Sequence, residues 1–130
     1  MNLDIHILQE KLCSLMCAEV TVTVKNEGLL SVEIPFFFAD GDPYQIYIKE
    51  LPGGIMRLTD MGHTMMHLSY ENDVDKLREG TRGKVFEQIK AEIQIHEENG
   101  EFYIDTPIEN LGLNIFRLGQ ALSKINDLTF

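Results

Sequence analysis

The sequence has few residues that could stabilise a fold by any means other than a hydrophobic core. It contains two cysteines, no tryptophan and four prolines among 130 residues. A framework of several disulfides is excluded, because it needs more cysteines than two. The chain is long enough to bury one core without disulfides or a structural metal, and no repeat, low-complexity tract or linker divides it. We therefore expect a single domain over residues 1–130.

Long apolar runs are also missing. The longest run covers residues 34–39, far below the roughly 20 residues that a membrane-spanning helix needs. The segment from Met1 to Asp4 has an acid where a secretory signal would have Lys or Arg, and no long apolar stretch follows it. We expect a cytoplasmic protein that makes no contact with a membrane.

Basic residues are scarce. The 11 Lys and Arg residues are outnumbered by 21 Asp and Glu residues, which gives a formal net charge of −10. This charge repels phosphates, so direct binding to nucleic acid is disfavoured. Two explanations stay open: the acidity serves only solubility, or the partner is a protein with a basic surface, such as a nucleic-acid-binding protein. In the second case two acidic stretches are candidate contacts, namely Glu71, Asp73, Asp75 and Glu79, and then Glu97, Glu98 and Glu101.

Hydrophobic periodicity predicts an α+β fold. Apolar residues recur at steps of three and four in residues 2–17, which indicates an amphipathic helix. Strict alternation then predicts four antiparallel strands, near residues 19–25, 30–36, 44–48 and 55–59. A short helix capped by Thr64, a helix near 82–91 and a hairpin around Asn99-Gly100 follow.

The last helix is predicted from both its start and its apolar face. Thr106-Pro107-Ile108-Glu109 has the capping-box pattern, so the helix is expected to begin there. Its apolar stripe consists of Leu111, Ile115, Leu118, Leu122 and Ile125. We expect a mainly antiparallel sheet, made of a four-stranded meander plus a small hairpin, that packs against the first and last helices.

A metal site is the most specific chemistry that the sequence suggests. Asp60, His63 and His67 are metal-ligand types that can converge at the turn before the short helix. The zinc-protease pattern needs Glu directly after its first His, but this sequence has Thr64 there. In the alternative interpretation Asp60 and Thr64 bind backbone amides of the turn, and the two histidines lie at the surface or at the edge of the core.

Other catalytic patterns each lack a required residue. Asp42 and Lys49 invite comparison with metal-dependent nucleases, but Tyr47 stands where such a site needs an acid two residues before its lysine. Cys13 and Cys17 are poorly spaced for a disulfide, and we expect both to be buried, unreactive thiols. We therefore predict no catalysis, no cofactor and no tightly bound metal.

Several motifs together resemble a known family. These are IPF at residues 34–36, GD at 41–42 followed by YQIYI at 44–48, and LTDMGHT at 58–64 with Leu68. They resemble a bacterial and phage family catalogued as domain of unknown function eighteen twenty-eight, over most of the chain. The resemblance implies a cytoplasmic setting related to phages or mobile elements and carries over no catalytic residue. Met61 stands where an acid is common in that pattern.

Setting and charge together suggest a function by analogy. Small acidic proteins of mobile elements often inhibit host defence, some by imitating the charge of nucleic acid. We expect a small non-catalytic binding protein, an inhibitor of a host nucleic-acid-handling defence protein of the anti-CRISPR or anti-restriction type. The alternative is a small metal-dependent hydrolase or nuclease that uses Asp60, His63 and His67.

Overall fold

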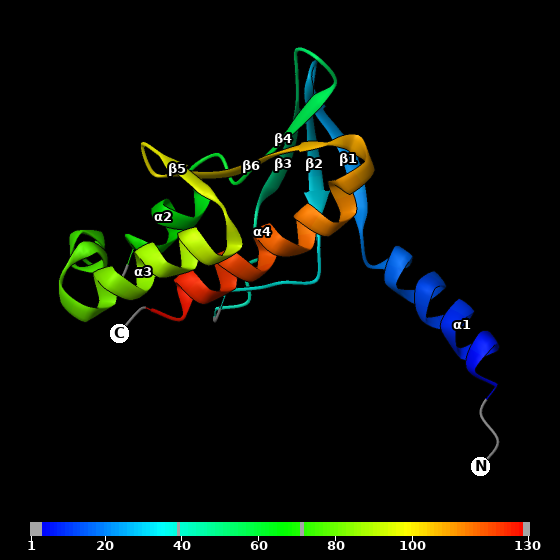
Figure 1. The fold of residues 1–130 in the computed structure, drawn as a ribbon, viewed down its shortest axis with the longest axis horizontal. Coiled ribbons are helices and arrows are strands. Elements are labelled where there is room, and N and C mark those ends of the chain that lie inside the picture. Colours follow the sequence, from blue (N-terminus) through cyan, green and yellow to red (C-terminus); the bar gives the residue numbers. More distant parts are fainter. Residues whose placement is uncertain (1–3, 39, 71, 129–130) are drawn as a thin grey trace.

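The protein folds as one six-stranded antiparallel sheet with four α-helices, in a computed structural model that describes residues 4–38, 40–70 and 72–128 (Figure 1). The strands run in the order β1-β2-β3-β4-β6-β5 across the sheet. The strands are β1 (Thr21–Asn26), β2 (Leu29–Glu33), β3 (Ile46–Leu51), β4 (Ile55–Thr59), β5 (His96–Glu98) and β6 (Glu101–Pro107). The helices are α1 (Ile5–Ala18), α2 (His63–Leu68), α3 (Gly80–Ile93) and α4 (Leu111–Asn126), with short 3-10 helices η1 (Val74–Arg78) and η2 (Ile108–Asn110). The predicted α+β class is confirmed.

The core lies between one face of the sheet and the pair α3 and α4 (Figure 1). Ile48 is opposite Leu58 on the neighbouring strand, and Leu58 is opposite Ile104, so alternation along each strand buries a continuous apolar row. Phe86 of α3 packs edge-on against Phe102 of β6, with ring centroids 6.0 Å apart. The predicted stripe of the last helix is confirmed from Ile115 onward: Ile115 is buried, Leu118, Leu122 and Ile125 are fully buried, and Leu111 is partly buried.

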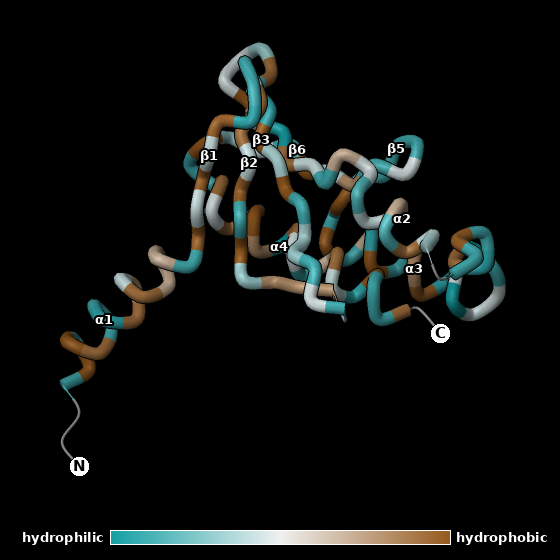
Figure 2. Tube along the Cα trace, turned by 180° about the vertical axis from the view of Figure 1, so that it is seen from behind, coloured by the Kyte–Doolittle hydropathy of each residue, from teal (hydrophilic) through white to brown (hydrophobic). Residues whose placement is uncertain are grey.

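Helix α1 does not cover the sheet, so this part of the prediction is wrong. It extends away from the body of the protein, and none of its residues is buried (Figures 1 and 2). Its start is stabilised locally, because the Asp4 carboxylate accepts the N–H groups of His6 and Ile7. Cys13 and Cys17 are exposed rather than buried. An amphipathic stripe shows that a helix has an apolar face and does not show what covers that face.

The capping-box prediction at Thr106 is also wrong. Thr106 is still part of β6, where it lies opposite Met56 of β4, and it is buried. Its hydroxyl accepts the Nδ2–H of Asn114 at 2.7 Å and donates to the Pro107 carbonyl at 2.9 Å. Pairing with β4 therefore continues through Pro107, and η2 separates the strand from α4. The hydroxyl supports α4 from outside and does not cap it.

The predicted second hairpin around Asn99-Gly100 is confirmed, and its first strand is short. Asn99 and Gly100 both have positive φ, 52° and 81°, as a tight turn that matches the twist of the strands requires. The strand β5 covers only His96–Glu98, because α3 runs to Ile93, two residues beyond its predicted end, and its C-cap Gln94 has the left-handed conformation. Between β2 and β3, residues 34–45 form a longer connection than alternation predicts, and this connection supplies part of the site described next.

Within the described residues, no helix is both long enough and apolar enough to cross a membrane.

Candidate functional site

Asp60 organises the turn between β4 and α2. Its side chain is fully buried, and its carboxylate accepts the backbone N–H groups of Gly62 and Phe102 at 2.9 Å each and of Thr64 at 3.2 Å. Burial raises the pKa of Asp60, and the N–H donors oppose this change. The interpretation that Asp60 satisfies backbone amides is confirmed. Thr64 lies inside α2 and does not cap it, because Gly62 occupies the N-cap position.

His67 lies beside the carboxylates of Asp40 and Asp42, which were not predicted as its neighbours. Its Nε2 is 2.9 Å from Oδ2 of Asp40 and 3.4 Å from Oδ2 of Asp42. The imidazole is held by Phe38, whose ring stacks on it with centroids 3.8 Å apart and planes 10° apart. The Asp42 N–H donates to the Asp40 carboxylate at 3.0 Å and, with a smaller effect from His67, lowers the pKa of Asp40. The loop after β2 thus meets α2 at a polar cluster.

His63 is close to this cluster without belonging to it. Its ring centroid is 6.2 Å from that of His67, and its Nδ1 is buried without a hydrogen-bond partner. Burial lowers the pKa of His63, so the neutral imidazole is favoured.

The predicted ligand trio Asp60, His63 and His67 is therefore not assembled. In the part of the chain that the structure describes, the ligand atoms that lie within 4.8 Å of one another belong to Asp40, Asp42 and His67. The only sequence signal for this cluster was the Asp-Gly-Asp triplet at 40–42, and it was missed because the same triplet is typical of an ordinary turn.

The two predicted acidic stretches meet at one end of the protein. Arg78 of η1 donates to both carboxylate oxygens of Glu97, and Lys90 of α3 lies 3.0 Å from the same residue. The side chain of Glu97 is only 8% exposed, and the Arg78 hydrogen bonds hold its pKa below the usual range. Glu97 is therefore occupied by internal pairs. Glu71 lies outside the described residues.

The other predicted contact residues differ in their accessibility. The Asp73 carboxylate caps η1 by accepting the N–H of Asp75 at 3.1 Å. Glu101 is half-buried and accepts the hydroxyl of Thr59 at 2.8 Å. Asp75, Glu79 and Glu98 are exposed.

Charged residues of both signs are concentrated in this part of the chain. Residues 71–101 contain nine acids and five bases, an excess of four out of the chain's ten. The region of the two stretches is therefore mixed in charge, and only its exposed acids are available to a basic partner.

Six of the 16 large apolar side chains that are exposed among the described residues lie on α1. Five large residues at helical spacing form what we call the α1 stripe, coloured brown in Figure 2. The stripe consists of Ile5, 80% exposed, Leu8, 40%, Leu12, 47%, Leu15, 65%, and Met16, 56%. Single exposed apolar residues are normal on a protein, but a contiguous patch of several marks an interaction site.

An apolar groove continues this surface onto the body of the protein. Its volume is about 470 Å³, and it lies between the C-terminal end of α1 and the start of α4. The residues that line it are Cys13, Met16, Cys17, Val20, Gly112, Ile115 and Phe116. The stripe and the groove together form one uncovered apolar surface.

Comparison with known proteins identifies a family and no characterised relative. The family model described as domain of unknown function DUF1828 matches residues 34–125. This segment contains the Asp40, Asp42 and His67 cluster, α3 and all of α4 except its last residue, whereas α1, β1 and β2 precede it. No curated protein and no solved structure matches the chain.

Proposed function

Because the chain belongs to the family of domain of unknown function DUF1828, whose description assigns no activity, we propose its function from its exposed surfaces. The protein is a non-catalytic binding protein, and α1 is the element that engages its partner. The observation that carries this proposal is the α1 stripe, an apolar helix face that none of the described residues buries.

Covering the stripe would be energetically favourable. Complete burial of one Leu, Ile or Met side chain contributes roughly 1.5–3 kcal/mol, and five such residues are 40% to 80% exposed. An isolated helix of 14 residues is marginal in water. A partner that covers the stripe therefore gains buried apolar area and also stabilises α1 itself.

The charge of the chain favours a basic partner. Over α1 and the two cap residues that flank it, the acids Asp4, Glu10 and Glu19 outnumber the single base Lys11. The net charge of −10 attracts a positive surface at long range and repels a second copy of the same chain. The partner that fits is a different protein with an apolar groove edged by Lys and Arg side chains.

We propose more specifically that the protein is an inhibitor that acts in the bacterial cytoplasm. A phage or mobile element would encode it, and its target would be a host defence protein that handles nucleic acid, of the anti-CRISPR or anti-restriction type. The acidity of the chain and the setting implied by the family resemblance support this role as an inhibitor.

The proposal is tested by affinity purification from a bacterial lysate at low and high ionic strength. We expect a basic protein to be retained at low salt and lost at high salt, because screening weakens attraction between exposed charges. Reversal of Glu10 and Glu19, which leaves the Asp4 cap of α1 intact, should weaken retention more than reversal of the exposed acids Asp75 and Glu98. Retention that neither reversal changes would show that the acidity serves only solubility.

A metal-dependent hydrolase is the second candidate, favoured by one observation. Asp40, Asp42 and His67 offer three ligand atoms within 4.8 Å, and a three-ligand set leaves coordination positions open for water and substrate. Elemental analysis of protein purified without chelator tests this candidate. It predicts a stoichiometric divalent metal that His67→Ala abolishes and His63→Ala retains. Metal-free wild-type protein would contradict it.

A further inference from the structure

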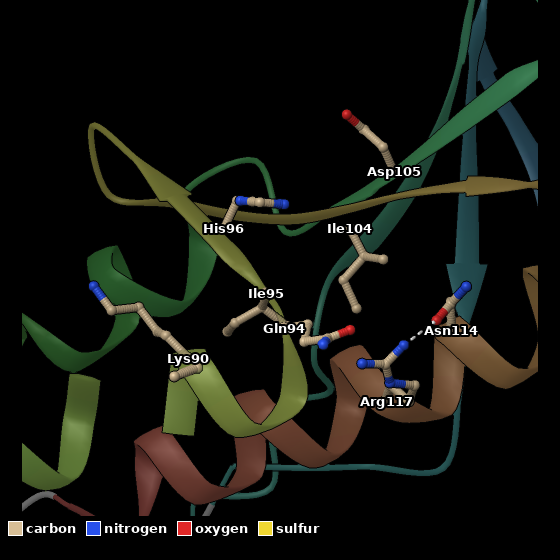
Figure 3. A pocket seen from close by; sticks show the side chains of 9 residues that line it. Lys90, Gln94, Ile95, His96, Ile104, Asp105, Asn114 and Arg117 are labelled. Carbon is tan, nitrogen blue, oxygen red and sulfur yellow. Dashed lines mark hydrogen bonds between the residues drawn. The ribbon is translucent and has the colours of Figure 1, made fainter. Parts of the chain in front are cut away.

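A second cavity lies between the end of α3, the β5–β6 hairpin and α4 (Figure 3). Its volume is about 550 Å³. Two isoleucines, Ile95 and Ile104, form apolar wall, and the remaining lining residues are mostly polar. They are Lys90, Ala91, Gln94, His96, Asp105, Asn114 and Arg117.

Arg117 contributes a positive charge to this cavity that no carboxylate balances. Its Nη1 donates to Oδ1 of Asn114 at 3.0 Å, and its Nη2 donates to the backbone carbonyl of Ile93. Both acceptors are neutral, and no carboxylate among the described residues forms an ion pair with the guanidinium. The residue is only partly exposed. A partly desolvated cation without a counter-charge is costly, and here it occurs in a chain with ten excess acids.

The other charged groups at the cavity are bound elsewhere. The Asp105 carboxylate pairs with Arg57 at 2.7 Å and 2.9 Å, and Figure 3 shows that it points away from Arg117. Lys90 is bound to Glu87 and Glu97. The uncompensated charge at the cavity is therefore that of Arg117.

Gln94 adds a free polar side chain beside this charge. Its backbone has φ 61° at the C-terminal end of α3, a position where glycine is normally favoured. Among the described residues its carboxamide has no hydrogen-bond partner, and it extends toward the same space as the Arg117 guanidinium (Figure 3). The chain thus places an unpartnered amide donor where a side chain is conformationally unfavourable.

We propose that this cavity binds a small organic anion through its carboxylate or phosphate group. The anion pairs with the N–H groups of Arg117 that the protein does not use, since guanidinium has five donors in a fork that matches both anions. Gln94 donates a further hydrogen bond, and the apolar part of the ligand lies against Ile95 and Ile104. This inference is independent of the function proposed for α1.

Nuclear magnetic resonance titration of the full chain tests the proposal, with inorganic phosphate and benzoate as separate probes and chloride at equal ionic strength as the control. We expect saturable shifts in the Gln94 side-chain amide and the Arg117 Nε–H with at least one probe and none with chloride. The tighter probe identifies which of the two anionic groups the cavity prefers. Shifts that never saturate with either probe would overturn the proposal.

Two variants of α4 each remove one positive charge, the first inside the cavity and the second outside it. Arg117→Gln should weaken binding at least about tenfold, the range expected for loss of a charge-assisted hydrogen bond. Lys124→Gln, at an exposed position outside the cavity, should change it less than about twofold. Equal affinity of Arg117→Gln and wild type would overturn the proposal.

A third variant keeps the test decisive if Arg117→Gln does not fold. Gln94→Gly removes the amide and relieves the left-handed backbone, so folding is preserved or improved. We expect weaker binding of the same probe by a factor of about three to ten, as for the loss of one hydrogen bond. Unchanged affinity of Gln94→Gly would overturn the proposal as well, because Gln94 is one of the two groups that it assigns to the anion.

Discussion

Asp60 is the residue on which the turn before α2 depends. Asp60→Ala leaves the N–H groups of Gly62, Thr64 and Phe102 without their acceptor in a buried region. We expect it to lose about 3 kcal/mol of unfolding free energy or more, because each unsatisfied buried donor is costly. Asp60→Asn should lose less, since its amide oxygen retains one acceptor. Urea denaturation measures both, and a loss below about 1 kcal/mol in Asp60→Ala would contradict this role.

Glu97 makes the stability of the protein depend on pH. The Arg78 hydrogen bonds keep the pKa of Glu97 lower in the folded chain than in the unfolded chain. Such a group stabilises the fold above its unfolded pKa, and this contribution is lost as the pH falls through the folded pKa. From about pH 5 downward, wild type should therefore lose more stability than Glu97→Gln in thermal unfolding. Glu98→Gln, at an exposed neighbour, should follow wild type. Parallel profiles for wild type and Glu97→Gln would exclude the linkage.

Residue roles could be predicted from the sequence only where they depend on local geometry. The Asp60 bonds to Gly62 and Thr64 span two and four residues, so the strand-to-helix turn was predictable from its sequence. His67 meets Asp40 across 27 residues, and that contact depends on the path of the connection between β2 and β3. Periodicity carries no information about such a path.

At the scale of elements, the exposure of α1 gives a direct prediction about its cysteines. Cys13 and Cys17 are both exposed, so both should react with Ellman's reagent in the folded protein about as fast as in the unfolded chain. Absorbance under native and denaturing conditions measures this. Two protected thiols in the free protein would show that α1 packs against the body. Protection that appears only with a partner would support the proposed binding surface.

The elements that the sequence predicted well are those with local signals. Alternation predicted β1 to β4 in order, and Asn99-Gly100 predicted the second hairpin. The start of α4 was mispredicted, because pairing of β6 with β4 holds Thr106 in the strand. The packing of α1 was mispredicted, because an apolar stripe is equally typical of a core helix and of a helix that binds a partner.

At the scale of the whole molecule, net charge was predictable and its distribution was not. Arg78 and Lys90 neutralise Glu97 although they are 19 and 7 residues from it in the sequence. The family match covers residues 34–125 and so contains most of the core, whereas α1 lies before it. The family match therefore contains most of the core, and the helix proposed to bind the partner lies outside it.

The most direct measurement compares two faces of α1 in affinity purification from a bacterial lysate at low salt. The double variant Leu8→Gln, Leu12→Gln changes the stripe. The control Ile7→Gln changes an exposed apolar residue on the other face of the helix. Gln is used in both because its helix propensity is close to that of Leu. Wild type and Ile7→Gln should retain the same basic protein, and the stripe variant should bind it at least about tenfold more weakly. Equal retention by the stripe variant, or recovery of only a second copy of this chain, would contradict the account.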